Sequence, residues 1–168
     1  QDYHSHLGTR RGGMVLFDKK EGFQRQIHNI ENTPFRTKFE RDLADFRGHA
    51  GLGCISDSDP QPLLVRSHLG LYAIVTVGII NNTDELVKAY LSDKGQQFLT
   101  LSSGRVNVTE LTAALINQEN DLVSGILHAM EVIDGSMTIL ILTEEGELIA
   151  ARDSMGRLPV LIGQREDG

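Results

Sequence analysis

Short runs of apolar and β-branched residues form two groups, one in the first half of the chain and one at its end. Such runs, bounded by Gly, Pro and small polar residues, predict strands. The first two flank the polar, glycine-containing stretch 18–22, which predicts a hairpin, and the last three predict an antiparallel meander with buried apolar residues. The predicted strands are residues 14–17, 23–28, 51–56, 63–67, 71–77, 137–143, 147–152 and 160–162.

Apolar residues recur at helical spacing in the segments between these strands. Asn82 and Thr83 are candidate caps for one helix, and Asn107, with Glu110 three positions later, resembles a capping box that opens another. Residues 121–130 predict a further helix. Strands first, helices in the middle and strands last favour stacked layers over a βαβ series. An earlier amphipathic helix, expected to lie on a sheet, is predicted by the stripe Phe35, Phe39, Leu43 and Phe46.

The composition is that of a globular protein and argues against two classes of partner. The 168 residues fit one domain, and no apolar run approaches the ~20 residues of a membrane span. The formal charge of −7 is spread over both halves, which disfavours nucleic-acid binding. The one cysteine forms no internal disulfide and no secretory signal is visible, so a cytoplasmic location is predicted. The missing initial Met and the polar last residues predict a domain cut at both ends.

Three local patterns admit a chemical interpretation and a structural one. His4 and His6 in a strand would point the same way, but two imidazoles without a Cys or carboxylate partner do not make a site, so no metal or cofactor is predicted. Cys54 lies in an apolar strand with no local base to lower its pKa, and an inert buried thiol is expected. Residues 8–13 match neither glycine-rich phosphate fingerprint, which favours a tight turn before the strand at residue 14.

Five segments, taken in order, carry a family resemblance. The most specific is 150–163, which resembles Ala-Arg-Asp-Pro-x-Gly-Ile-Arg-Pro-Leu-x-x-Gly. Without the resemblance, residues 153–159 of this segment predict a loop, in which Arg152 and Asp153 are expected to form a structural ion pair. The others are 6–13, resembling His-Arg-Gly-Gln-(x)n-Gly; 51–53 with Gln61-Pro62, resembling Gly-Ile-Gly-His-x-Arg-Tyr and its downstream Gln-Pro; 76–86, resembling His-Asn-Gly-x-(x)n-Asn; and 107–111, resembling Ser-Asp-Ser-Glu-x. Together they resemble the class II glutamine amidotransferase domain, in its amidophosphoribosyltransferase branch.

This resemblance implies both a fold and a reaction. The fold is α+β, a four-layer αββα sandwich of two antiparallel sheets of the N-terminal-nucleophile hydrolase type, and it would occupy residues 1–168 with a phosphoribosyltransferase domain beyond the C-terminus. The family hydrolyses the side-chain amide of glutamine with an N-terminal cysteine, assisted by an oxyanion hole, in the context of purine nucleotide biosynthesis. That nucleophile would lie upstream of Gln1, so no catalytic residue is expected within the chain.

The pocket positions depart from the family pattern. The arginine that would hold the α-carboxylate of glutamine falls at Ser56, and the aspartate that would pair its α-ammonium falls at Val108. The asparagine donor of the oxyanion hole falls at Val77, which leaves only the backbone of Gly78. Each lost charged contact costs roughly 1.5–3 kcal/mol, and a lost oxyanion donor roughly 2.7–4 kcal/mol. The sequence therefore predicts a domain without glutaminase activity.

The leading hypothesis is a regulatory or structural domain attached to a phosphoribosyltransferase half. A homo-oligomer is expected, and three roles stay open: use of free ammonia, binding of another small molecule in the altered pocket, or holding the oligomer together. One alternative is an active glutamine-hydrolysing domain that supplies ammonia for phosphoribosylamine formation. A second alternative is a protein–protein interaction module that uses the helix at 35–46 or a sheet edge. For Phe39, its helical phase with Phe35 and Leu43 favours the core over an interface.

Overall fold

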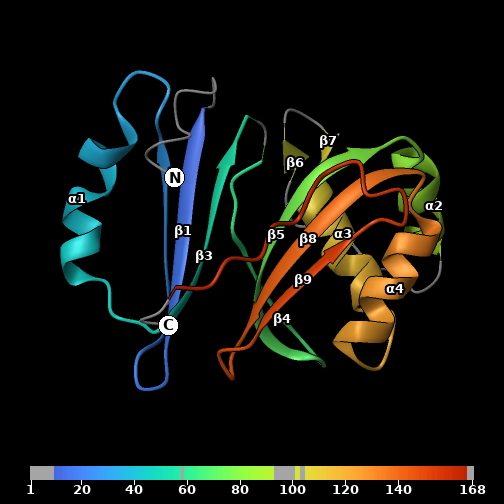
Figure 1. The fold of residues 1–168 in the computed structure, drawn as a ribbon. Coiled ribbons are helices and arrows are strands. Elements are labelled where there is room, and N and C mark those ends of the chain that lie inside the picture. Colours follow the sequence, from blue (N-terminus) through green and yellow to red (C-terminus); the bar gives the residue numbers. More distant parts are fainter. Residues whose placement is uncertain (1–9, 58, 93–100, 103–104, 166–168) are drawn as a thin grey trace.

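Two antiparallel sheets lie face to face between one helix on one side and three on the other (Figure 1). The computed structural model describes residues 10–57, 59–92, 101–102 and 105–165. The layers follow the order helix, sheet, sheet, helices, which confirms the predicted four-layer αββα sandwich. No helix of the described residues is long and apolar enough to cross a membrane.

The first sheet has the order β2-β1-β3. Strands β1 (Arg11–Asp18) and β2 (Gly22–Asn29) form the predicted hairpin. The Asp18 carboxylate accepts hydrogen bonds from the backbone N–H of two turn residues, and Gly22 closes the turn with φ 75°. Strand β3 (Ala50–Ser56) pairs with the other edge of β1, and its last residue lies opposite Arg11.

The second sheet has the order β4-β5-β8-β9, with every neighbouring pair antiparallel. Its longest strand continues three residues beyond the predicted end, because residues 78–80 pair with residues 135–137. The strands are β4 (Leu63–Ser67), β5 (Gly70–Ile80), β8 (Gly135–Thr143) and β9 (Leu148–Arg152).

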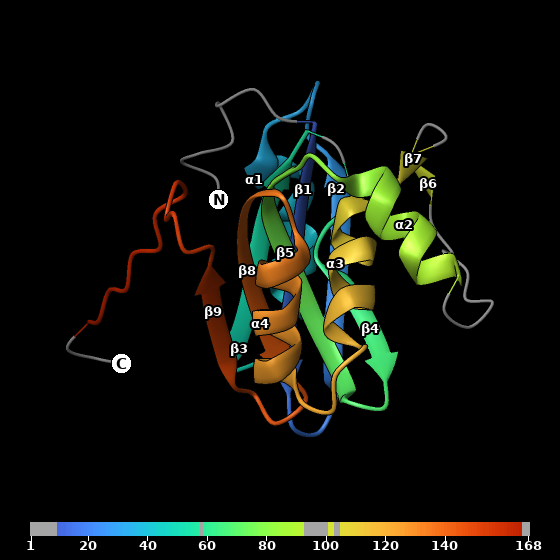
Figure 2. The same ribbon diagram turned by 90° about the vertical axis from the view of Figure 1, so that its right-hand side faces the viewer.

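The predicted buried strand at residues 160–162 is wrong. Leu161 and Ile162 are 91% and 94% exposed, and the segment after β9 leads away from both sheets (Figure 2). An apolar run becomes a strand only where a sheet edge offers its backbone partners, and this segment lies on neither sheet.

The helices begin where short polar side chains satisfy their free amides. Asn107 accepts a hydrogen bond from the Glu110 N–H at 2.9 Å, and Asp121 accepts one from the Ser124 N–H at 2.9 Å, which confirms both predicted starts. The Asn82 side chain instead donates a hydrogen bond to Val132 O and accepts one from the Asp134 N–H. The helices are α1 (Phe35–Asp45), α2 (Thr83–Ser92), α3 (Val108–Ile116) and α4 (Leu122–Val132), and the short strands β6 (Leu101–Ser102) and β7 (Arg105–Val106) pair between α2 and α3.

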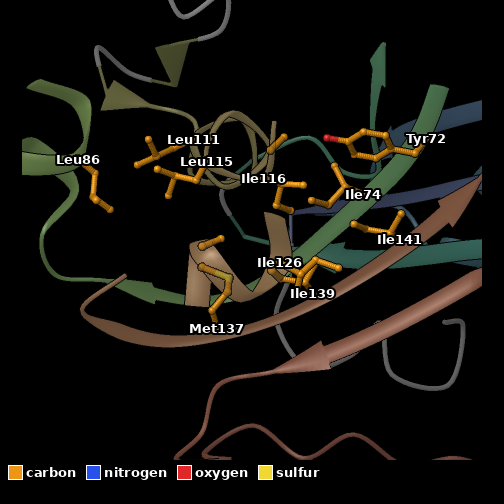
Figure 3. Packing of buried hydrophobic residues seen from close by; sticks show 12 residues of the cluster. Tyr72, Ile74, Leu86, Leu111, Leu115, Ile116, Ile126, Met137, Ile139 and Ile141 are labelled. Atoms are coloured by element: carbon orange, nitrogen blue, oxygen red, sulfur yellow. The ribbon is translucent and has the colours of Figure 1, made fainter. Parts of the chain in front are cut away.

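Three apolar clusters separate the four layers. The largest lies between the second sheet and the helices α2 to α4, where isoleucines of β5 and β8 meet Leu111, Leu115 and Ile126 (Figure 3). A smaller cluster fills the space between the sheets: Val15, Phe17, Leu52, Cys54, Ala73, Val75 and Leu142.

Helix α1 covers the outer face of the first sheet with only part of its predicted stripe. Phe35 and Phe39 are buried and stack at 4.3 Å between ring centroids, whereas Leu43 is 52% exposed. The helix therefore packs on the sheet through these two rings, and near its end Asp42 Oδ2 lies 2.6 Å from Nε2 of His28 in β2. Because Phe39 has no exposed surface, it is a core residue and the interaction module cannot bind a partner through it.

The predicted ion pair between Arg152 and Asp153 is wrong. The Asp153 carboxylate instead accepts hydrogen bonds from the backbone N–H of Met137 at 3.0 Å and of Gly156 at 2.9 Å. Backbone donors of the following turn and of β8 are nearer than the neighbouring guanidinium, so Asp153 ties the loop after β9 to the second sheet.

Acid is expected to weaken this tie. The Met137 N–H, followed by the Gly156 N–H, lowers the pKa of Asp153 below the value of about 3.9 of a free aspartate. Because the pKa is lower in the folded state, Asp153 stabilises the fold above about pH 4, and this contribution disappears as pH falls through the folded pKa. Asp153→Asn should therefore be less stable than the parent at pH 7, with the difference in unfolding free energy shrinking as the pH falls below about 4 in urea unfolding. A difference that stays constant over this range would contradict the assignment.

Candidate functional site

The four positions singled out in the sequence meet at one cavity of about 270 Å³ at the end of the gap between the sheets. Ser56 ends β3, Val77 and Gly78 lie in the second half of β5, and Val108 is the first residue of α3. Three elements far apart in the sequence therefore supply the wall of this cavity. The remaining lining residues are Cys54, Ile55, Asp57, Asp59, Gln61, Thr76 and Thr109.

Gln61 fixes the wall of the cavity formed by the loop between β3 and β4. Its buried amide donates to Thr76 O at 3.0 Å and accepts from Thr76 N–H at 2.7 Å. Strand β4 pairs with β5 only as far as Ile74 and so does not reach Thr76. The Gln61 side chain therefore makes the two hydrogen bonds to Thr76 that a neighbouring strand would make. On the other side, Gly13 of β1 approaches Gln61 O so closely that a Cβ at residue 13 would overlap it. The loop is thereby held between the two sheets.

The backbone N–H of Gly78 points toward this same edge of β5. Gly78 lies opposite Met137 in the pairing of β5 with β8. The Met137 N–H donates to the Asp153 carboxylate and the Met137 C=O accepts from the Asp153 N–H, so Gly78 and Met137 exchange no hydrogen bonds. The Gly78 N–H therefore lies on the opposite edge, the edge at which Thr76 bonds Gln61. One backbone donor is thus directed to the cavity edge beside Gln61.

The Val77 side chain gives no such donor. Side chains alternate along a strand, so Val77 lies on the face of β5 that carries Ala73 and Val75 in the core between the sheets. It is 50% exposed at the end of that core and lines the cavity with methyl groups. A carboxamide at this position would offer a second hydrogen-bond donor to the cavity.

The start of α3 is held against β5 by a buried polar contact. Thr76 Oγ1 and Thr109 Oγ1 are 2.8 Å apart, and both residues are buried. Together with the Asn107 cap, this contact places the backbone of Val108 at the cavity wall. The Val108 side chain packs against the apolar cluster between the second sheet and the helices α2 to α4, and carries no charge.

A carboxylate nevertheless stands beside Val108. Asp59 is only 5% exposed, lines the cavity, and accepts a hydrogen bond from the Val108 N–H at 3.2 Å through Oδ2. Sequence reasoning missed this residue because Asp59 lies in a loop whose path depends on the Gln61 contact. Its one local signal is its place two residues before the Gln61-Pro62 pair.

Comparisons with known proteins show to which family the chain belongs. A sequence model of the family described as "Glutamine amidotransferase domain" matches residues 50–168. The chain belongs to this family. It is 28% identical to the amidophosphoribosyltransferase of Methanocaldococcus jannaschii over 171 residues, which cover 96% of this chain and 35% of the relative. With the amidophosphoribosyltransferase of Synechocystis sp., the identity is 30% over 108 residues, 64% of this chain and 21% of the relative.

A solved structure extends the likeness to three dimensions. The Bacillus subtilis glutamine phosphoribosylpyrophosphate amidotransferase, complexed with ADP and GMP, aligns with a TM-score of 0.72 and 25% identity over 90% of this chain and 33% of that one. This chain is therefore an amidophosphoribosyltransferase-like glutamine amidotransferase domain, as the motif order predicted. It spans about a third of the length of the first relative and of the solved structure.

A second charged residue of this amidotransferase domain also escaped the sequence analysis. Arg11 is the direct ladder partner of Ser56, and both lie on the face of the first sheet that carries Val15 and Cys54 toward the second sheet. The guanidinium thus starts next to the place where the family arginine would stand. Arg11 is nevertheless not among the residues that line the cavity.

The remaining chemical candidates give no nucleophile or metal centre in the described part of the chain. Burial raises the pKa of the Cys54 thiol to about 11, so Cys54 is protonated at neutral pH, as expected of an inert buried thiol. His4 and His6 lie outside the described residues, as do residues 8 and 9 of the predicted turn, whereas residues 11–13 already belong to β1. Among the described residues, no group of three His, Cys, Asp or Glu side chains could hold a metal ion.

Proposed function

We propose that this amidotransferase domain does not hydrolyse glutamine and serves as a regulatory or structural domain of an amidophosphoribosyltransferase-related protein. The observation that carries the proposal is the presence of Ser56 and Val77 at the cavity wall. These are the places where the family resemblance calls for a guanidinium and a carboxamide. The Ser56 hydroxyl and the Val77 methyl groups supply neither.

The two substitutions act on different steps of glutamine hydrolysis. A serine hydroxyl cannot form the two parallel charge-assisted hydrogen bonds of an arginine with a carboxylate, which weakens binding by roughly 1.5–3 kcal/mol. A missing oxyanion donor lowers kcat by roughly 100- to 1,000-fold. The Gly78 N–H supports only part of the oxyanion hole. Both the affinity and the chemical step are therefore impaired.

The wider setting of the domain is also part of the proposal. Its relatives are about three times as long as this chain, and their name denotes a phosphoribosyltransferase. We expect a phosphoribosyltransferase domain in the same polypeptide, a homo-oligomer, a cytoplasmic location and a role in purine nucleotide biosynthesis. In that setting the protein would use free ammonia or respond to a ligand in the altered cavity. Any nucleophilic cysteine would lie upstream of Gln1.

A glutaminase assay on the full-length natural protein tests this function. Glutamate release should not exceed the rate without protein, and glutamine should not raise the melting temperature. Turnover of roughly 1 to 1,000 per second, typical of enzymes, would refute the proposal and support the active glutamine-hydrolysing alternative. Ammonia-dependent formation of phosphoribosylamine by the same sample serves as the control that the protein is intact.

A further inference from the structure

We infer that the altered cavity binds a small primary amine that carries an amide but no carboxylate. This inference rests on the proposed loss of glutaminase activity, because it concerns the same cavity. It names the ligand class from the groups that line the cavity rather than from the family reaction. Three observations support it: the placement of Asp59, the charge of the lining residues, and the direction of the Gly78 amide.

Asp59 provides an acceptor for an ammonium group. The residue is only 5% exposed, and the Val108 N–H is the one hydrogen-bond donor that the described residues offer its carboxylate. A carboxylate has about four acceptor sites, and a buried charge with few partners is costly. A cationic group in the cavity would supply both the missing donors and the opposite charge. The cavity thus keeps a carboxylate that can bind an ammonium group, but this carboxylate belongs to residue 59 instead of residue 108.

The described lining of the cavity offers no cationic side chain for a ligand carboxylate. The lining residues include two carboxylates, Asp57 and Asp59, and none of those described is Lys or Arg. A ligand carboxylate would therefore be repelled by two like charges with no cation in direct reach. Arg11 lies next to Ser56 in the first sheet but outside the lining, so it moderates this field without forming the wall.

The rest of the cavity suits a short neutral group. The Gly78 N–H points to the cavity edge and can donate to a carbonyl oxygen, whereas Gln61 and Thr76 already bond one another. A volume of about 270 Å³ admits only a small molecule. A molecule with an ammonium at one end and an amide at the other, such as 4-aminobutanamide, matches these groups. It is glutamine without its α-carboxylate.

Titration calorimetry on the full-length protein, with four probes that share one three-carbon chain on an amide, tests this inference. The probes are 4-aminobutanamide (amine and amide), glutamine (both charges), 4-carbamoylbutanoate (carboxylate and amide) and butanamide (amide alone). The amine should bind at least tenfold more tightly than each of the others, because only the amine makes a charge-assisted contact without repulsion. Tighter binding of glutamine or of the carboxylate probe, or no binding of the amine, overturns the inference.

Variants of the two carboxylates locate the contact. Asp59→Asn keeps an oxygen for the Val108 N–H and should weaken binding of 4-aminobutanamide at least tenfold, whereas the exposed Asp57→Asn should cost less. An Asp59→Asn protein with the same melting temperature as the parent separates loss of charge from loss of folding. Arg11→Gln should not weaken amine binding, because it removes a like charge near the cavity. Equal binding by Asp59→Asn and the parent overturns the inference.

The two proposals fail in different ways. Hydrolysis of glutamine refutes the proposed function whatever the amine does. Failure of the amine to bind, with glutamine neither bound nor hydrolysed, refutes only the ligand assignment. Tight binding of glutamine without hydrolysis, abolished by Arg11→Gln, would show that Arg11 has replaced the arginine missing at Ser56, and would also refute the ligand assignment.

Discussion

Gly13→Ala is expected to lower the free energy of unfolding by about 3 kcal/mol or more. A Cβ at residue 13 would overlap the carbonyl oxygen of Gln61 and lie 2.9 Å from Pro62 Cδ. These atoms cannot move aside easily, because the Gln61 side chain is bonded to both backbone groups of Thr76. The loop or β1 must shift, and a shift exposes buried polar groups. Urea unfolding monitored by circular dichroism measures the loss.

A matched glycine separates this overlap from the general effect of replacing glycine. Gly163→Ala places a Cβ where no atom lies within 4 Å, so the unfolding free energy should change by less than about 0.5 kcal/mol. Because the same loop carries Asp59, Gly13→Ala should also impair binding at the cavity. A Gly13→Ala protein as stable as the parent would show that the loop is not clamped between the sheets.

The predictable part of the fold is the part encoded by neighbouring residues. The hairpin of β1 and β2 follows from its turn, and α3 and α4 begin at Asn107 and Asp121 because a cap needs only a side chain and an amide three residues on. The errors concern contacts between distant segments. Residues 160–162 have the composition of a strand but lie on neither sheet, and Leu43 has helical phase but is 52% exposed.

The difference between local and long-range contacts also explains which site residues could be predicted. The order of the motifs predicted which positions would face a common pocket, and Ser56, Val77, Gly78 and Val108 do line one cavity. Asp59 and Arg11 were missed because their relevance depends on the path of a loop and on the register of two strands, neither of which a motif encodes. Gly13 was assigned to a turn, whereas the structure requires it for the close approach of Gln61.

Ser56→Arg is expected to raise the affinity of the domain for glutamine by about 10- to 150-fold, the equivalent of roughly 1.5–3 kcal/mol. The new guanidinium would start from the end of β3 at the cavity wall, where it can form two parallel hydrogen bonds with a ligand carboxylate and offset the charges of Asp57 and Asp59. Asp59 would remain available for the α-ammonium. Calorimetric titration of the full-length variant with glutamine measures the gain.

Two control variants test whether the geometry of Ser56→Arg matters as well as its charge. Ser154→Arg adds the same charge at an exposed loop residue outside the cavity, and should leave the affinity for glutamine unchanged. Ser56→Lys brings the charge to the cavity without the planar fork, and should give a smaller gain than Ser56→Arg. The variant should also reduce the preference for 4-aminobutanamide over glutamine, because a carboxylate then has a partner. An unchanged affinity of Ser56→Arg for glutamine would mean that the missing guanidinium is not what excludes this substrate.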